Sequence, residues 1–352
     1  MCLAPHRAIA LGSTILLLAL CACSPTDPPP STPAAPATAP ATDASGPLVL
    51  YSGRSESLVG PLIQAYRDET GSEVEVRYGG TAELAATLLE EGDRSPADLF
   101  YAQDPGGLGA VDALLAPLPS ETLSRVADGF RDGDGRWVGV SGRARVVAYH
   151  RATLAPADLP EDLKGFTDAA WKGRLGWAPS NASFQTMVTG MRAAWGDDAT
   201  RSWLEGILAN EPVAYASNTP LVAAVAAGEV EVGLTNHYYL YRFLAEEGDD
   251  FGARNHFLPG GGPGSLVMVS GVGLLSSSAR PKAARALVDY LLDENAQSYF
   301  ASTTYEYPLA AGVPPAVDLP ALESLNLVDL SLGELADLQG TVTLLQEVGA
   351  LP

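Results

Sequence analysis

From Leu48 to Tyr101 the chain alternates short apolar segments with helical patterns, and this alternation restricts the fold more than any other feature. A strand–helix–strand–helix–strand order requires crossover connections, so it predicts a mostly parallel sheet with helices on both faces. Ligands of such sheets bind beyond the carboxyl ends of strands, which here are the loops Ser52–Ser55 and Ala102–Asp104. The predicted strands are Leu48–Tyr51, Glu73–Tyr78 and Asp98–Tyr101, and the predicted helices are Leu58–Thr70 and Thr81–Glu91.

A second unit repeats this order further along the chain. Its strands are predicted at Leu175–Trp177, Pro212–Tyr215 and Glu229–Leu234, and each leads through small or polar residues into a helix. Free N–H groups at helix N-termini attract anions, but Asn218 and Asn236 also suit the role of helix caps. For either residue alone the cap is the simpler interpretation. Because three such helix starts follow strands of one predicted sheet, a shared anion-binding site is as consistent with the sequence as three helix caps.

The size, the charge and the missing motifs of the chain exclude several classes of protein. About 306 residues run from Pro47 to the C-terminus, which suits two lobes better than one core. The formal net charge of −21 argues against nucleic acid as a partner. No HExxH, GxSxG, P-loop or GxGxxG motif lies at a strand–helix junction, and no β-rich repeat suggests an adhesion module. The sequence therefore predicts a binding protein that is not an enzyme.

The N-terminal residues indicate export and anchoring. An apolar run from Ile9 to Leu20 is short for a membrane span but fits the core of a secretory signal. It ends in Leu20-Cys21-Ala22-Cys23, a pattern that resembles a bacterial lipobox and predicts lipidation of Cys23, with residues 1–23 as the lipoprotein signal segment. An ordinary signal peptide is the alternative. The Pro, Ala and Thr-rich residues 24–46 predict a disordered linker, so we expect an extracytoplasmic, membrane-anchored lipoprotein.

Four segments carry a resemblance to a known family. They are Ser95–Tyr101 (SPADLFY), Ser141–Val147 (SGRARVV), Asn236–Tyr239 (NHYY) and Glu306–Leu309 (EYPL). In this order they resemble the periplasmic ferric-iron-binding proteins, and the similarity extends from Leu48 to the C-terminus. The resemblance implies the two-lobed type II periplasmic binding protein fold, with the ligand in the interlobe cleft. It also implies a monomer that delivers Fe³⁺ to the transmembrane permease subunits of an ABC importer.

By the same resemblance, the chain crosses between lobes near Arg143 and near Val267. We therefore expect lobe 1 to comprise residues 47–143 and 268–318, and lobe 2 to comprise residues 144–267 and 319–352. Each lobe is expected to be a mostly parallel sheet flanked by helices.

Tyr238 and Tyr239 are the candidate metal ligands. Fe³⁺ is a small, hard cation that favours anionic oxygen, and a bound cation can displace the phenol proton. On a strand adjacent side chains point to opposite faces, whereas at a helix start they lie roughly 100° apart and can converge. The helix N-terminus also favours phenolate. The alternative is that one ring packs in the core and the other lies on the surface.

Departures from the family pattern make an added anion important. The resemblance places Ser55 where many members have histidine, Gln103 where they have glutamate, and Phe184 where one subgroup has tyrosine. Asp104 and Tyr101 are possible substitutes, although Tyr101 is more readily explained by packing. We therefore expect carbonate or phosphate to complete the iron sphere. The alternative ligands are an iron chelate and an anion such as an organic phosphate.

The candidate anion-binding residues are arginines that match carboxylate or phosphate, and small or polar residues that align with the family's anion region. For each arginine a solvated or interlobe salt bridge is the alternative. The candidates are Arg54, Arg143, Arg145, Asn181, Ala182, Ser183, Asn218 and Asn236, with Ser55, Gln103 and Asp104 as possible cleft residues.

Overall fold

The computed structural model describes residues 43–328, 330 and 332–352. The predicted signal segment, Cys23 and most of the linker lie outside this part of the chain. No helix of the described residues is long and apolar enough to cross a membrane.

The described residues form two lobes joined by two long strands, β5 (Trp137–His150) and β10 (Val267–Leu275). In the described part of the chain the main strand order is β2-β1-β3-β10-β5-β8-β6-β7. β1, β2 and β3 pair in parallel, as do β6, β7 and β8, whereas β10 runs antiparallel to β3 and β5. This α/β architecture confirms the predicted fold class, and the joining strands add the antiparallel pairs.

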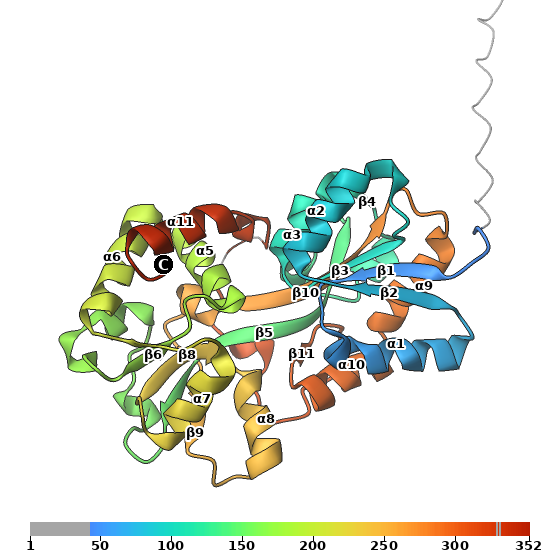
Figure 1. The fold of residues 1–352 in the computed structure, drawn as a ribbon. Helices are drawn as coiled ribbons and strands as arrows, with labels where there is room; N and C mark the ends of the chain where they lie inside the picture. The colour runs from blue at the N-terminus through green and yellow to red at the C-terminus, as the bar shows by residue number, and fades with distance from the viewer. Residues whose placement is uncertain (1–42, 329, 331) are drawn as a thin grey trace, which may run out of the picture. The chain divides into compact units, whose positions relative to one another are not determined.

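The first lobe, on the right in Figure 1, contains three parallel strands with helices around them. Its βαβαβ opening follows the sequence prediction, with the first helix beginning two residues earlier than expected. Its elements are β1 (Leu48–Ser52), α1 (Glu56–Thr70), β2 (Val74–Tyr78), α2 (Thr81–Glu91), β3 (Leu99–Ala102), α3 (Pro105–Ala110), β4 (Leu115–Ala116), α4 (Ser120–Leu123), α9 (Pro281–Leu291), α10 (Glu294–Tyr299) and β11 (Tyr307–Pro308).

The second lobe, on the left in Figure 1, repeats the strand–helix order. The strand predicted at Glu229–Leu234 is shifted, because it begins at Val232 and ends at Asn236. Its elements are β6 (Leu175–Trp177), α5 (Ala182–Trp195), α6 (Asp197–Ala209), β7 (Val213–Ala214), α7 (Asn218–Ala227), β8 (Val232–Asn236), α8 (Tyr238–Glu247), β9 (Ala253–His256) and α11 (Leu338–Glu347).

Strand β5 changes partners where it passes between the lobes. It pairs with β10 as far as Ala144 and with β8 from Arg145 onward. Gly139 lies in a close approach, since a Cβ there would come within 2.5 Å of the Phe130 carbonyl oxygen. The limits of the lobes at residues 143/144 and 267/268 stay a prediction.

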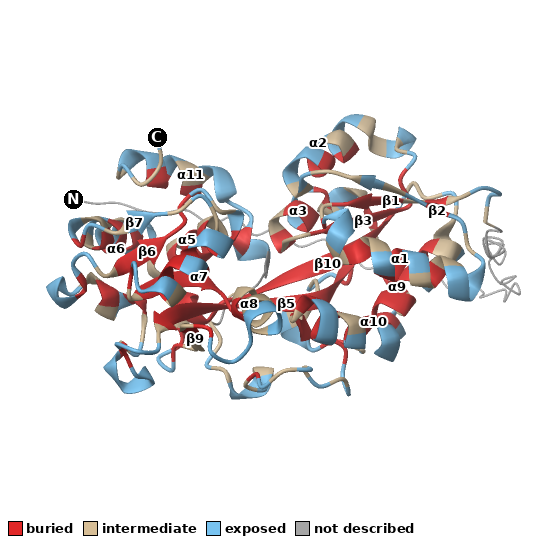
Figure 2. Cartoon of the chain, turned by 60° about the horizontal axis from the view of Figure 1, so that its bottom comes forward, coloured by how far each residue is buried: buried red, intermediate tan, exposed pale blue. Residues whose placement is uncertain are grey.

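Two hydrophobic cores lie on either side of this junction. One gathers side chains of β1, β3, α1, α2 and α9, and the other gathers side chains of β6, β8, α5 and α6, joined by Leu344 and Leu345 of α11. Figure 2 shows the buried strands β5 and β10 running between them. Residues at the junction thus lie between two packed cores, which suits a site built from both.

Candidate functional site

The tyrosine pair lies at the first turn of α8. Strand β8 ends at Asn236, His237 occupies the N-cap position, and Tyr238 and Tyr239 begin the helix. Their rings stack, with centroids 4.2 Å apart and planes inclined by 27°. Tyr238 is buried and Tyr239 half-buried. The guanidinium of Arg242, one turn later, lies 4.9 Å from the Tyr238 ring centroid and 5.9 Å from that of Tyr239. The rings therefore converge on one side of the helix.

The environment of Tyr238 opposes loss of its phenol proton when no cation is bound. Burial raises the pKa of Tyr238, and the neighbouring Tyr239 phenol raises it further, while Arg143 opposes the shift. A bound cation would replace the proton and reverse this balance.

A cluster of polar side chains lies beside the pair and comes from three strand–helix junctions. Arg145 of β5 donates from Nη1 to Asn236 Oδ1 at 3.0 Å and to Ser183 Oγ at 3.2 Å. Asn218 Nδ2 donates to Ser183 Oγ at 3.0 Å and to Asn181 Oδ1 at 3.3 Å. We call Arg145, Asn181, Ser183, Asn218 and Asn236 the polar cluster. The structure thus brings together five of the eight predicted anion-binding residues.

The polar cluster retains hydrogen-bonding capacity. Within the described residues, Nε and Nη2 of Arg145, Oδ1 of Asn218 and Nδ2 of Asn236 are buried without a hydrogen-bond partner. Burial lowers the pKa of Arg145 to about 9, against the opposing effect of the Tyr239 and Tyr238 phenols. Unpaired buried donors are costly, so this cluster has the chemistry of an anion site.

Arg54 and Arg143 form a second group of buried arginines near Tyr238. Arg54 Nη2 donates to Glu306 Oε1 at 2.6 Å, and its Nη1 donates to Gln103 Oε1 at 3.4 Å. Arg143 Nη2 donates to the Gln103 carbonyl oxygen. Burial alone would lower the pKa of Arg54, but Glu306 above all, with smaller contributions from Tyr101 and Tyr238, holds it above its usual value.

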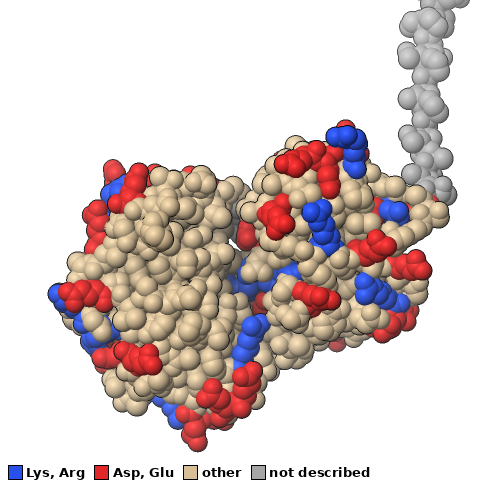
Figure 3. Space-filling view, in the orientation of Figure 1, with Lys and Arg blue, Asp and Glu red and all other residues tan. Residues whose placement is uncertain are grey.

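Figure 3 shows basic side chains where the two lobes meet, whereas acidic side chains spread over the outer surface of this face. The buried arginines Arg54, Arg143 and Arg145 add positive charge close to the two phenols, within an acidic chain.

Comparison with known proteins identifies the family of the chain. Residues 94–330 match the family described as bacterial extracellular solute-binding protein. The Fe(3+)-binding periplasmic protein of Serratia marcescens is 32% identical over 315 residues, which cover 88% of this chain and 93% of that protein. The chain belongs to this solute-binding family, among the periplasmic ferric-binding proteins.

Two solved structures share the fold of this solute-binding protein. Iron-bound HitA from Pseudomonas aeruginosa has a TM-score of 0.78 and 34% identity, covering 86% of this chain and 99% of that one. Trichodesmium IdiA (FutA), in complex with iron and citrate, has a TM-score of 0.75 and 28% identity over the same shares. The family is a non-enzymatic, extracytoplasmic component of transport, which confirms the predicted family and the prediction that the chain is not an enzyme.

Several predicted residues have other roles in this solute-binding protein. Asp104 caps α3, since its Oδ1 accepts a hydrogen bond from Gly107 N at 3.2 Å. Ser55 is exposed at the N-cap position of α1, where its hydroxyl contacts that of Ser57, and Ala182 is the exposed first residue of α5. Tyr101 is fully buried, as packing would require.

The alternative of Asn218 and Asn236 as helix caps is wrong. Ser217 and His237 occupy the N-cap positions of α7 and α8, and both asparagine side chains bond to other side chains of the polar cluster. Asn181 alone is a cap, because its Oδ1 accepts from Ser183 N at 3.0 Å.

Sequence reasoning missed the structural importance of Glu306 and His237. Glu306 belongs to the EYPL segment, which carries part of the family resemblance but gives this glutamate no role. His237 Nδ1 accepts from Ala144 N at 3.0 Å, so its Nε2 donates to the Tyr305 carbonyl oxygen at 2.8 Å. The position of His237 directly before the tyrosine pair is the sequence feature that could have identified it. This neutral imidazole fixes the start of α8 to the crossing strand β5.

The His237 ring predicts a pH dependence of folding. Burial lowers its pKa to about 4, whereas the unfolded value is 6.5. As pH falls below 6.5, His237 becomes protonated in the unfolded chain but stays neutral in the folded chain until about pH 4. Its contribution to the free energy of unfolding, on the order of 3 kcal/mol, is therefore complete above pH 6.5 and is lost between pH 6.5 and pH 4.

Chemical denaturation of wild type and His237→Gln at pH 7 and pH 4.5 checks this expectation. The wild type should lose more stability on acidification than the variant, whatever the variant's stability at pH 7. Equal losses would show that His237 is not the responsible group.

No group of three or more His, Cys, Asp or Glu side chains in the described residues could hold a metal ion.

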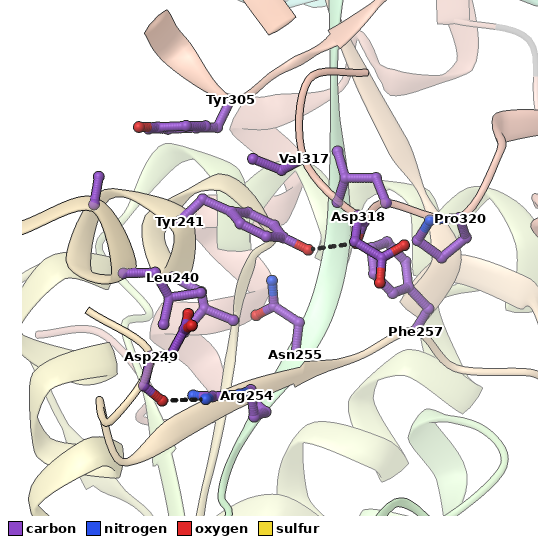
Figure 4. A pocket seen from close by; sticks show the side chains of 13 residues that line it. Leu240, Tyr241, Asp249, Arg254, Asn255, Phe257, Tyr305, Val317, Asp318 and Pro320 are labelled. Atoms are coloured by element: carbon purple, nitrogen blue, oxygen red, sulfur yellow. Dashed lines mark hydrogen bonds between the residues drawn. The ribbon is translucent and has the colours of Figure 1, made fainter. Parts of the chain in front are cut away.

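A separate cavity of about 810 Å³ lies against the same helix, α8, and is shown in Figure 4. Leu240, Tyr241 and Phe257 line it, together with Tyr305 and the segment Val317–Pro320. Tyr241 points across it and donates to the Asp318 carbonyl oxygen at 3.1 Å. Tyr241 therefore contributes to this cavity and not to the tyrosine pair.

Proposed function

We propose that this protein captures ferric iron between its lobes through the phenolates of Tyr238 and Tyr239, with a synergistic anion, and delivers it to an ABC permease. The observation that carries the proposal is the pair of stacked phenols at a helix start, next to buried arginines with unpaired donors. Carbonate or phosphate is the anion that we propose.

The charges explain why metal and anion would bind together. Two phenolates leave one positive charge on Fe³⁺ and leave coordination positions unfilled. An anion held by Arg145 and its polar cluster would supply both oxygen ligands and negative charge, while Arg54 and Arg143 add positive charge near Tyr238. Asn181, Ser183, Asn218 and Asn236 would orient it. Ala182, Ser55, Gln103 and Asp104 would line the cleft.

An iron chelate, or an organic phosphate alone, is the second candidate. It is favoured by the absence, among the described residues, of any group of three or more His, Cys, Asp or Glu side chains that could hold a metal ion. The Trichodesmium relative, solved with iron and citrate, supports it too.

Titration of the metal-free protein with ferric iron tests the proposal, with visible absorption and metal analysis as readouts. Iron from a weak chelator, with carbonate or phosphate present, should give one iron per chain and a phenolate-to-iron charge-transfer band. A colourless protein that binds an organic phosphate without iron would favour the second candidate.

We also propose that the protein is a monomer anchored outside the cytoplasm by a lipid on Cys23. Cys23→Ser should release the protein into the soluble periplasm or the medium, because the acyl chains would be lost while the body, which begins far from Cys23, still folds. Cell fractionation with detection of the protein measures this. Cys21→Ser is the matched control and should remain at the membrane; retention of the Cys23 variant would contradict the anchor.

A further inference from the structure

Glu306, of the EYPL segment, lies directly before β11 and is only 1% exposed. Its Oε1 accepts from Arg54 Nη2 at 2.6 Å, and its Oε2 accepts from Ser141 Oγ at 2.5 Å. Ser141 is fixed in turn by Ser270 at 2.7 Å. Both carboxylate oxygens thus have partners, Arg54 in the loop after β1 and Ser141 on β5, so the side chain has little freedom.

The charges around Glu306 do not balance. Arg54, Arg143 and Arg145 are each no more than 2% exposed, and Glu306 is the only buried carboxylate among them. The other buried carboxylate of the described residues, Asp98, precedes β3 and pairs with Arg280 at 3.0 Å, at the opposite end of that strand from Gln103. Arg54 and Arg143 act directly on Glu306, and Arg145 adds a third buried guanidinium group two positions along β5 from Arg143. Three buried positive charges are thus accompanied by one buried carboxylate, and two positive charges remain. An excess of buried charge is unfavourable unless a ligand compensates it.

We propose that Glu306 is a positioning residue that holds Arg54 and sets the charge which the bound anion must balance. This inference rests on the proposed function, since it concerns the same site. By engaging Nη2 of Arg54, Glu306 leaves that arginine with Nε alone unpaired, whereas both Nε and Nη2 of Arg145 are unpaired and can donate to an anion. By cancelling one of three positive charges, it suits the site to a dianion and limits the repulsion of an incoming Fe³⁺.

The effects of removing this charge have opposite signs for the two ligands. Glu306→Gln keeps the size of the side chain and one acceptor oxygen for Arg54, and its amide N–H can donate to Ser141 Oγ, but it leaves three uncompensated positive charges. An added unit charge on the order of 10 Å from a ligand, at an effective dielectric constant of about 20, changes affinity by roughly tenfold. Inorganic phosphate should therefore bind the iron-free variant about tenfold more tightly, and Fe³⁺ should bind the phosphate-saturated variant about tenfold more weakly.

The experiment measures phosphate binding by calorimetry without iron, and iron binding by competition with a chelator at saturating phosphate. Asp98→Asn is the matched control, because it also removes a carboxylate that is 1% exposed from an arginine pair, but away from the site. It should change neither affinity. If Glu306→Gln only destabilised the protein, its affinities for phosphate and for Fe³⁺ would both fall. That result overturns the proposal, and so does an unchanged phosphate affinity.

A double variant, Arg54→Gln with Glu306→Gln, keeps the test decisive if the single variant folds poorly. It removes one charge of each sign, so its iron affinity should return toward the wild-type value. An iron affinity that is as weak as in the single variant overturns the charge-setting role. The wild-type visible band reports separately on the proposed function: its absence would refute iron binding, while the phosphate measurements would still decide the role of Glu306.

Discussion

Replacing both Tyr238 and Tyr239 with phenylalanine is expected to abolish ferric-iron binding and the visible absorption that accompanies it. The change removes two phenolate oxygens but keeps the two stacked rings, whose centroids are 4.2 Å apart. Among the described residues no carboxylate and histidine group replaces them. Iron affinity should fall by more than about 100-fold, since changes to residues behind metal ligands alone cost roughly 10- to 100-fold.

Absorption spectra and metal content of the purified variants measure this loss. Tyr241→Phe is the matched control, because it lies on the same helix but its hydroxyl bonds to the Asp318 carbonyl oxygen outside the site. That variant should keep both iron and colour. If the double variant still bound Fe³⁺ with the same band, the tyrosines would be packing residues and the anion or chelate hypothesis would be preferred.

The sequence was sufficient for the fold because its local patterns agree with its long-range packing. The predicted helix Thr81–Glu91 is observed with those bounds, and its following Gly92 adopts a positive φ of 53°. The strand predicted from Glu229 begins three residues later, because the chain first turns at Gly228, whose φ is 75°. Alternation of apolar residues could not reveal this turn, since Val230 is buried as well.

The site was less accessible to sequence reasoning, because its contacts join residues that are distant in the chain. The sequence identified Arg145 and Asn236 as candidates, but not their mutual hydrogen bond across 91 positions. Glu306 pairs with Arg54, 252 positions away, and no local pattern announces such a pair. Asn218 and Asn236 suited caps by residue type, and only the packing of three junctions shows that their side chains meet instead.

Arg145→Met is expected to stabilise the empty protein while removing its response to phosphate. Burial lowers the pKa of Arg145 to about 9, well below the usual arginine value, so its charge lies in an unfavourable place. Stability is lost as pH falls from the usual arginine range to about 9, and the cost of the buried charge is therefore present in full at neutral pH. A similar apolar side chain removes that cost, and replacing buried charges by packed apolar groups stabilises proteins by up to about 4 kcal/mol.

Chemical denaturation with and without phosphate measures both effects. Phosphate at about 100 times its Kd should stabilise the wild type by about 2.7 kcal/mol, and the variant should lose most of this gain. Arg280→Met is the matched control: it leaves the Asp98 carboxylate buried and unpaired, so it should destabilise the protein but keep the phosphate response. If Arg145→Met destabilised the empty protein as much as Arg280→Met does, the fold would already compensate the burial of the Arg145 charge. Arg145 would then have a structural role. Stabilisation of Arg145→Met, together with its loss of the phosphate response, would instead mean that the fold retains an unfavourable charge because the anion requires it.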